Sequence, residues 1–477
     1  MREDILNNKL KENSYKERLM KGFKEVFANK DREALEWKKS GGKVAGCLGG
    51  DVPEELLIAG GLLPVRIYGS VKKNPILANQ YLEQGFNPYI RAQFESIADG
   101  SYQYLDYLVI SNSSDPIIRI YYYLRAMDQI EAVSKVPKLY FFDFLHTRFR
   151  TSALYNRERV KEFRSEIEKW IGTTINKEDL IKAIETCNEN RFLLQQIRKK
   201  RISSTPRISG TEALQIIGSS MLMPKRKHNK LLRDLIQHID HFQEKQGVKV
   251  FVTGSTHDHT EFYELVESCG AVIVGEDHDF GYRQYTGEIN TQAGWIDGIV
   301  DRYHLRYQSA SKATVSERVN SLIQQVKESN VQGVIFYIRR ADDACLWDFP
   351  QQKQALHQMN IPVLLLDGQS YHLTQSDKDN IRTQVSDFIE SILQKSKEEI
   401  KGGQKETENG KKINEISTRM VSGIAPKSEK WGTVSLRKCR RSSRNLSGNG
   451  YTLCCESMVV VSLFGETNVS LLFGTAK

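Results

Sequence analysis

Apolar and polar residues follow one another along the chain in a pattern that predicts alternating strands and helices. Short apolar runs typical of buried strands lie at 105–110 and 135–144. A polar turn, SNSSDP at 111–116, separates the first of these runs from the amphipathic segment IIRIYYYLRAM. Strands that alternate with helices are typical of a parallel sheet, so we expect an α/β fold.

The same alternation occurs a second time, after a long interval with a helical apolar period. The later strands are expected in VKVFVTGS, AVIVGE, VQGVIFYIRR and IPVLLLDG. We therefore predict two Rossmann-like lobes with parallel sheets, joined by helices. The predicted segments are an N-terminal helical segment (1–38), a first α/β lobe (39–151), a helical connection (152–246), a second α/β lobe (247–397) and a basic, poorly ordered tail (398–477).

The tail differs in composition from the rest of the chain. Residues 401–477 contain 13 Lys and Arg against 6 Asp and Glu, which leaves 55 against 53 for the first 400 residues. The body is therefore near neutral, and nucleic acid is not an expected partner of it. For the tail we consider a disordered or partly ordered appendage, an out-of-frame extension, and a basic arm that binds nucleic acid.

Hydropathy and cysteine usage limit the class of protein. No apolar stretch approaches the roughly twenty residues of a membrane helix. The first thirty residues are charged throughout, unlike a signal peptide, so a cytoplasmic protein without a membrane partner is expected. The body has four widely spaced cysteines and no CxxC pair, which favours reduced thiols over a zinc site or a disulfide framework: Cys47, Cys187, Cys269 and Cys345.

A glycine-rich segment at 41–69 is the first candidate for a binding site. Gly49 and Gly50 end an apolar run and lead into Pro53, Glu54 and Glu55, which open an apolar helix. A turn of this kind brings backbone N–H groups and the positive end of a helix dipole together, an arrangement that binds anions. Glu54 and Glu55 are candidates for a catalytic acid–base pair. The alternative is that one carboxylate caps the helix and the other faces solvent.

Two further motifs contain histidine and aspartate in short runs. These are His257–Asp258–His259 and Asp277–His278–Asp279. Neutral imidazoles and carboxylates are metal ligands, but such close spacing within loops is also typical of solvated turns. Both interpretations are kept open.

Four blocks of the chain resemble one protein family, in the family's order. They are the glycine-rich segment, NPYIRAQF through YYYLR (87–125), KVFVTG through GYRQY (249–285), and VQGVIF through LLLDG (331–368). The family is that of the 2-hydroxyacyl-CoA dehydratase D-component and benzoyl-CoA reductase subunits. The resemblance covers roughly residues 15–397.

The resemblance implies a chemistry and a set of partners. Members of the family pair as heterodimers and usually hold one [4Fe–4S] cluster between two lobes. An ATP-dependent activator protein delivers a low-potential electron, with which a CoA thioester is dehydrated or reduced by radical chemistry in anaerobic metabolism. A paralogous subunit with its own cluster, the activator and a CoA thioester are therefore the expected partners.

This sequence departs from the family at the cluster-ligand positions. Where the family has its three ligand cysteines, this chain has Asn87, Ser114 and Asp342, and Cys345 is the nearest thiol to the third position. Oxygen donors are hard ligands, whereas iron–sulfur clusters are held by thiolates. We therefore expect this chain to lack a cluster of its own, and Cys345 is its single weak candidate for a metal ligand.

The remaining prediction is a polar pocket between the lobes. Asn87, Ser114 and Asp342 are each expected at or near the carboxyl end of a strand, where open α/β sheets bind ligands. Gly49, Gly50, Asp115, Arg119, Arg339 and Arg340 complete the predicted substrate pocket. The two strand-end arginines could meet CoA phosphates or be solvated, and the pocket itself could be filled by water or side chains. The alternative function is a non-redox protein that binds an acyl-CoA or a similar anion.

Overall fold

A computed structural model describes residues 2–130, 135–292, 294–306, 309, 312–395 and 397–398. These residues belong to one compact unit, Met1–Glu406. Residues 399–477, to which most of the predicted basic tail belongs, lie outside the described residues.

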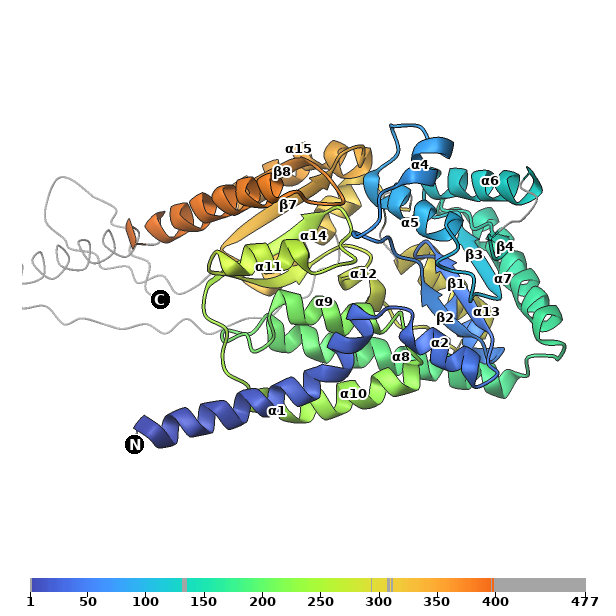
Figure 1. The fold of residues 1–477 in the computed structure, drawn as a ribbon, viewed down its shortest axis with the longest axis horizontal. Coiled ribbons are helices and arrows are strands. Elements are labelled where there is room, and N and C mark those ends of the chain that lie inside the picture. The colour runs from blue at the N-terminus through green and yellow to red at the C-terminus, as the bar shows by residue number, and fades with distance from the viewer. Residues whose placement is uncertain are drawn as a thin grey trace, which may run out of the picture. The chain divides into compact units, whose positions relative to one another are not determined.

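Two four-stranded parallel sheets with the same strand order form the framework (Figure 1). The first has the order β2-β1-β3-β4 and the second β6-β5-β7-β8, so each places its first strand between its second and third. The predicted α/β fold with two parallel-sheet lobes is thus confirmed. The strands are β1 (Val44–Leu48), β2 (Leu63–Arg66), β3 (Tyr107–Ser111), β4 (Lys138–Phe142), β5 (Val248–Gly254), β6 (Ala271–Glu276), β7 (Gly333–Arg339) and β8 (Val363–Gln369).

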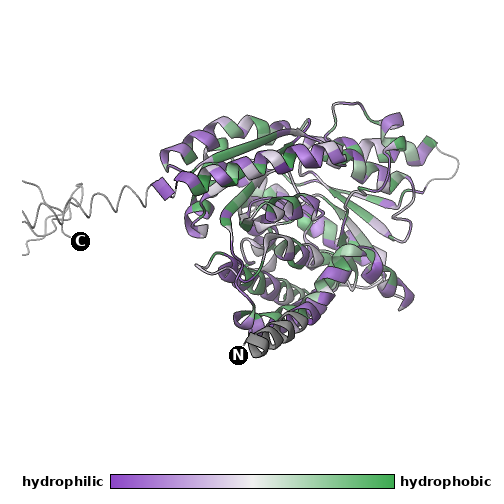
Figure 2. Ribbon diagram, turned by 60° about the vertical axis from the view of Figure 1, so that its left-hand side comes forward, coloured by the Kyte–Doolittle hydropathy of each residue, from purple (hydrophilic) through white to green (hydrophobic). Residues whose placement is uncertain are grey.

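Both faces of each sheet are covered by helices. In β1, Val44 and Leu48 pack into one core and Ala45 and Cys47 into another on the opposite face, as the two-residue period of a strand requires. Strands buried on both faces have few positions for polar residues, which explains their nearly continuous apolar runs. Figure 2 shows the strands mostly in green, whereas the outer helices alternate between purple and green.

Helices connect the strands. Among them, α4 and α5 begin directly after or at a proline. The helices are α1 (Arg2–Ala28), α2 (Arg32–Lys39), α3 (Glu54–Ala59), α4 (Ile76–Tyr81), α5 (Pro88–Ala98), α6 (Asp115–Ile130), α7 (Arg150–Ile171), α8 (Lys177–Arg201), α9 (Gly210–Ser219), α10 (Lys225–His238), α11 (Glu261–Ser268), α12 (Tyr282–Tyr285), α13 (Trp295–Asp301), α14 (Val315–Ser329) and α15 (Asp343–Gln358), with a π-helix at Arg302–Arg306 and a closing helix at 375–395.

The start of α15 differs from the prediction. The sequence predicts a helix that starts at Pro350, but α15 begins at Asp343 and contains Pro350 in its interior. A proline removes one helical N–H donor and is usually excluded from this position. Part of α15 packs on the second sheet and Leu356 is fully buried, so tertiary packing prevails over the local preference.

Helix α8 connects the two lobes through two buried arginines. Arg191 pairs with Glu55 of α3 in the first lobe. Arg201 pairs with Glu276 of β6 in the second lobe, with N–O distances of 2.9 and 2.7 Å, and also donates to the Ile273 carbonyl at 3.2 Å. Figure 1 shows α8 running below both sheets. One helix therefore fixes an element of each lobe.

We expect Arg201→Met to destabilise the protein by about 3–5 kcal/mol, because it leaves the buried Glu276 carboxylate without a counter-charge. Urea unfolding measures this loss. Arg198→Met is the matched control, since Arg198 lies on the same helix and pairs with the more exposed Glu328; its loss should be at most about 1 kcal/mol. Equal losses in the two variants would contradict the assignment.

The same pair predicts a dependence of stability on pH. Burial alone would raise the pKa of Glu276, but the Arg201 guanidinium holds it below its ordinary value of 4.5. A carboxylate with a depressed pKa stabilises the fold above its ordinary pKa, and the effect is lost as the pH falls through the folded-state value. The stability difference between wild type and Arg201→Met should therefore be full at neutral pH and shrink below pH 4.5. If the difference in unfolding free energy between wild type and Arg201→Met stayed constant down to about pH 3, the Arg201–Glu276 pair could not be the cause of the pH dependence.

Candidate functional site

In each sheet the chain adds strands first on one side of the first strand and then on the other. The two adjacent strands at which this change occurs define a reversal point, and open α/β sheets bind ligands next to the carboxyl ends of those two strands. In the first lobe this point lies between β1 and β3, and in the second between β5 and β7. Of the predicted site residues, Gly49, Gly50 and Ser114 follow the first pair of strands. Arg339, Arg340 and Asp342 end or follow β7. The predicted pocket residues thus gather at both reversal points.

The turn after β1 requires glycine. Gly49 has a φ of +97°, and a Cβ atom there would overlap the hydroxyl oxygens of Ser111 and Ser113. Gly50 lines a cavity of only about 20 Å³, which has room for one water. Asp51 is fully buried and pairs with Lys312 at 2.6 Å. The turn therefore packs tightly against the end of β3 and the loop that follows it. Its Asp51 carboxylate neutralises the ammonium of Lys312.

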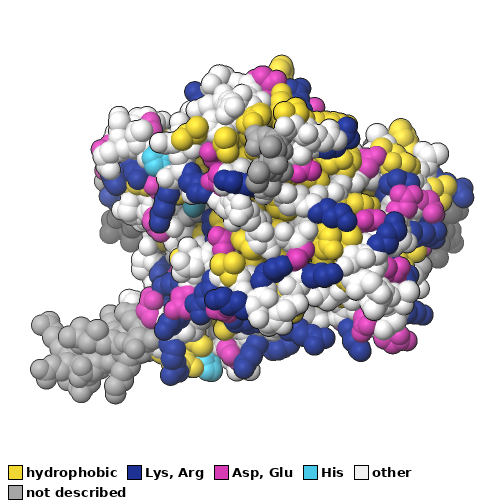
Figure 3. Space-filling model, turned by 45° about the vertical axis from the view of Figure 1, so that its right-hand side comes forward, with side chains coloured by type: hydrophobic (Ala, Val, Ile, Leu, Met, Phe, Trp, Pro, Cys, Tyr) yellow, Lys and Arg dark blue, Asp and Glu magenta, His cyan; other side chains and the backbone are white. Residues whose placement is uncertain are grey.

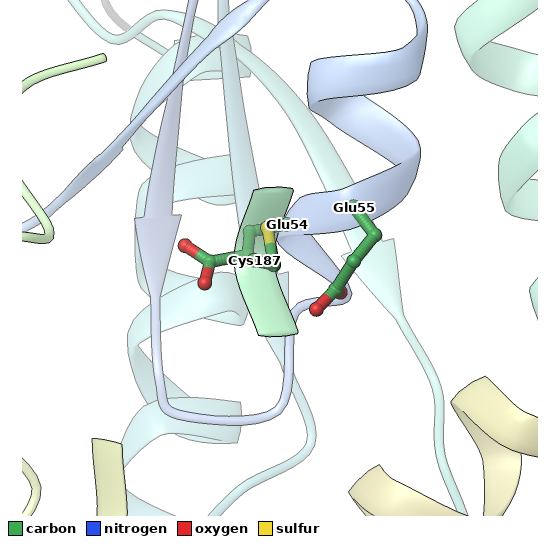
Figure 4. Close-up of side chains that lie close together, drawn as sticks. All are labelled: Glu54, Glu55 and Cys187. Carbon is green, nitrogen blue, oxygen red and sulfur yellow. The ribbon is translucent and has the colours of Figure 1, made fainter. Parts of the chain in front are cut away.

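Glu54 and Glu55 open α3 and lie close to Cys187 (Figure 4). Both carboxylates pair with cations. Glu54 lies 3.0 Å from the ammonium of Lys225. Glu55 is fully buried, pairs with Arg191 and accepts from the Tyr303 hydroxyl at 3.0 Å. Burial favours the neutral acid, but the Arg191 guanidinium lowers the pKa of Glu55 below its ordinary value. The Glu54 side chain is 16% exposed, whereas Glu55 is arranged as a permanent ion-pair partner in the interior.

These two carboxylates and Cys187 form a close group of potential metal ligands. Among the described residues, they are the one set of three or more His, Cys, Asp or Glu whose ligand atoms all lie within 4.8 Å of one another. Both carboxylates already have a cationic partner, and burial raises the pKa of the Cys187 thiol well above its ordinary value. A divalent ion would meet two neutralised carboxylates and a protonated thiol, so the group is better explained as part of the core.

Asn87 is the residue that precedes α5, whose Tyr89 contacts the second lobe. Its Oδ1 accepts from the backbone N–H of Tyr89 at 2.9 Å, which caps the helix. The Tyr89 ring lies 5.9 Å from both the Arg339 guanidinium carbon and the ring of Tyr371. Asn87 thus caps the helix whose Tyr89 ring packs beside Arg339 of the second lobe.

Arg339 and Asp342 form a connected network at the end of β7. Ser255 accepts from the backbone N–H of Arg339 at 2.9 Å and donates to the Asp342 carboxylate at 2.5 Å. The buried guanidinium donates to the Thr256 carbonyl and lies within 5.9 Å of three tyrosine rings. Its Nε and Nη2 atoms have no hydrogen-bond partner in the part of the chain that the structure describes. Two donors of a buried cation are thus left for a further group.

Ser114, Asp115 and Arg119 take a more peripheral position. The Ser114 carbonyl accepts from the N–H groups of Ile117 and Ile118 at the start of α6. Asp115 and Arg119 pair at 2.9 Å, and their side chains are 71% and 56% exposed. These two side chains pair on the outside of α6 instead of joining the network around Arg339.

The His257–Asp258–His259 motif lies inside the protein, between the lobes. His257 and Asp258 are fully buried, so the interpretation as a solvated turn is wrong. The Asp258 carboxylate accepts from the Gly69 N–H at 3.1 Å and from the Tyr371 hydroxyl at 2.9 Å. Burial lowers the pKa of His259 to about 4 and that of His257 well below its ordinary value. The Asp258 carboxylate thus joins the first lobe to the second, between two imidazoles whose ring nitrogens have no hydrogen-bond partner among the described residues.

A polar cavity of about 300 Å³ lies at the carboxyl ends of β5 and β6, and sequence reasoning missed it. Arg283, Arg318, Asp277 and Cys345 are among its lining residues. Burial raises the pKa of Asp277 above its ordinary range and that of the Cys345 thiol well above it. The position of Asp277 directly after a predicted strand is the signal that could have indicated this cavity.

The donor set does not fit a [4Fe–4S] cluster. Of the three predicted ligand positions, Asn87 caps a helix and Asp342 accepts from Ser255, and both offer oxygen. Clusters are held by thiolates, and Cys345 is a single thiol on α15 in the wall of the cavity of about 300 Å³. The four described cysteines lie on β1, on α8, after α11 and on α15.

Comparisons with known proteins agree with the resemblance of the sequence blocks. The family model for the 2-hydroxyglutaryl-CoA dehydratase D-component matches residues 50–392. The chain is 24% identical to the (R)-phenyllactyl-CoA dehydratase beta subunit of Clostridium sporogenes, over 80% of this chain and 100% of that protein. It is 23% identical to the beta subunit of the lactoyl-CoA dehydratase of Anaerotignum propionicum (79% and 99%) and 22% identical to a benzoyl-CoA reductase subunit of Thauera aromatica (75% and 94%).

No described helix combines the length and the apolar character needed to cross a bilayer. The matched segment begins at Gly50, just after β1, and contains β3, the second reversal point and the network around Arg339. The chain therefore belongs to the family of the 2-hydroxyglutaryl-CoA dehydratase D-component.

Proposed function

We propose that this chain is one subunit of a complex of the 2-hydroxyacyl-CoA dehydratase or benzoyl-CoA reductase type. In this complex it pairs with a paralogous subunit and contributes part of the site for a CoA thioester. The paralogue holds the [4Fe–4S] cluster, and an ATP-dependent activator supplies the electron. The relatives are themselves named as subunits of dehydratases and of a reductase, which supports the assignment to a multi-subunit assembly.

One observation is the main support for a subunit without its own cluster. The side chains at the predicted ligand positions are oxygen donors, and Asn87 and Asp342 are already used in hydrogen bonds within the protein. A site that had merely lost its iron would retain free thiols at these positions. The framework of the site is present, and its polar residues serve the protein's own structure.

Two arginines are the best candidates for contacts with the CoA thioester. Arg339 is buried with two unused donors, which suits a carbonyl or carboxylate oxygen. The Arg340 guanidinium is exposed and has no ion pair among the described residues. It also lies near Arg91, whose pKa is lowered by burial and by the charge of Arg340. An anionic phosphate would relieve the repulsion between these two cations.

We expect the isolated chain, purified without oxygen, to contain far less than one iron per chain. Iron and acid-labile sulfide analysis measures this, and about four iron per chain would refute the cluster-free subunit. The variant with Asn87→Cys, Ser114→Cys and Asp342→Cys, reconstituted with iron and sulfide, is the matched comparison. Its absorption in the visible range should indicate a cluster if the three positions converge as predicted.

Arg340→Ala should weaken the binding of CoA about tenfold, which corresponds to the loss of one charge-assisted hydrogen bond of about 1.4 kcal/mol. Calorimetry with free CoA and with an acyl-CoA measures this effect. Arg382→Ala is the control, because Arg382 is exposed and pairs with Asp379 on the closing helix. Equal affinity of wild type and Arg340→Ala would remove Arg340 from the site.

The alternative function is a non-redox protein that binds an acyl-CoA or a similar anion. The oxygen donors at positions 87 and 342 favour this alternative over a subunit that is redox-active by itself. Co-expression with a cluster-bearing paralogue distinguishes the two. A stable 1:1 complex with iron from the partner supports the subunit, whereas CoA binding without any complex supports the alternative.

A further inference from the structure

A second cavity lies at the opposite end of the first sheet's strands from the glycine turn. Its volume is about 490 Å³, and it is bounded by α2, the end of α3, the start of β2, α8 and α10. Leu63 and Pro64, the first residues of β2, belong to its wall, whereas the reversal point lies at the carboxyl ends of the strands. The cavity is therefore separate from the predicted substrate pocket.

The wall of this cavity is apolar and its size suits a small ligand. Apolar side chains from three separate parts of the chain face it, among them Ile58, Leu62, Ala183, Met223 and Pro224. Ligand pockets are commonly about 300–1,000 Å³ and are lined mainly by apolar residues. A water molecule in such a space can form few hydrogen bonds, because few polar groups line it.

The rim of the cavity has an excess of positive charge. The first turn of α10 is Lys225–Arg226–Lys227 and contains no acidic residue, although the positive end of a helix dipole disfavours cations. Lys225 pairs with Glu54 at 3.0 Å and Lys227 with Glu33 at 2.7 Å. Arg226 is exposed and has no ion pair among the residues that the structure describes. Figure 3 shows Lys and Arg gathered along the lower edge of the face it presents, at the level of α8 and α10 in Figure 1.

We propose that this cavity binds an amphipathic carboxylate, with its apolar body against Ile58, Leu62 and Met223. The carboxylate contacts Arg226 and the first N–H groups of α10, which have no partner within the helix. The apolar wall selects a hydrocarbon body, and the uncompensated cation at the rim selects a negative head group. This charge complementarity argues for an anion over a neutral lipid or a peptide. The proposal is independent of the function proposed above.

Calorimetric titration of the full chain with octanoate tests the proposal. We expect one octanoate per chain and at least tenfold weaker binding of octan-1-ol, which has a similar apolar body without the charge. Arg226→Ala should weaken octanoate binding about tenfold and leave octan-1-ol unchanged, since one charged contact is lost. Arg233→Ala is the matched control, because Arg233 lies on the same helix and pairs with Glu189; it should bind octanoate as the wild type does.

A second variant tests the cavity itself. Ala183→Phe fills the space next to Ile58 and Met223, so a folded variant should bind neither octanoate nor octan-1-ol. Trp37 also lines the cavity, and its fluorescence should respond to octanoate in wild type but not in Trp37→Phe. Absence of binding up to about 5 mM octanoate, or unchanged affinity in folded Arg226→Ala, would overturn the proposal. CoA binding, measured in the same variants, should be unaffected. A result that overturns the octanoate site therefore leaves the proposed CoA site untouched, and the reverse also holds.

Discussion

The two buried arginines of α8 determine how the lobes are joined. Arg191 and Arg201 are ten positions apart, which corresponds to roughly 15 Å along the helix axis. Each pairs with a carboxylate from a different lobe, Glu55 of α3 or Glu276 of β6. Neither pair can separate without leaving a charge in the interior, at a cost of several kcal/mol. The helical connection is therefore a fixed spacer between two sheets of identical strand order.

This spacer also positions the candidate site. Helix α3 follows directly from the glycine turn, and β6 is hydrogen-bonded to β5, whose end supplies Ser255. The orientation of both reversal points therefore depends on α8. Close to the site, the Asp258 carboxylate accepts from Gly69 of one lobe and Tyr371 of the other. The polar residues between the lobes thus hold the lobes together.

The fold was largely predictable from the sequence, and the use of its polar residues was not. Strands buried on both faces produce apolar runs that can be read locally, and the glycine at position 49 follows from its turn. The partners of Glu55 and Glu276 lie 136 and 75 residues away in the chain, so no local pattern reveals them. The burial of the His257–Asp258–His259 motif is likewise a tertiary effect. The short strand β2 and the early start of α15 depend on packing in the same way.

The rigid attachment of both lobes to α8 has a kinetic consequence. Hinge opening of two domains usually takes place in microseconds to milliseconds and requires an interface that can part at low cost. Here such an opening would have to break one of the two buried ion pairs of α8. The two sheets are therefore expected to keep their relative orientation on this timescale and to move together with α8 as one body.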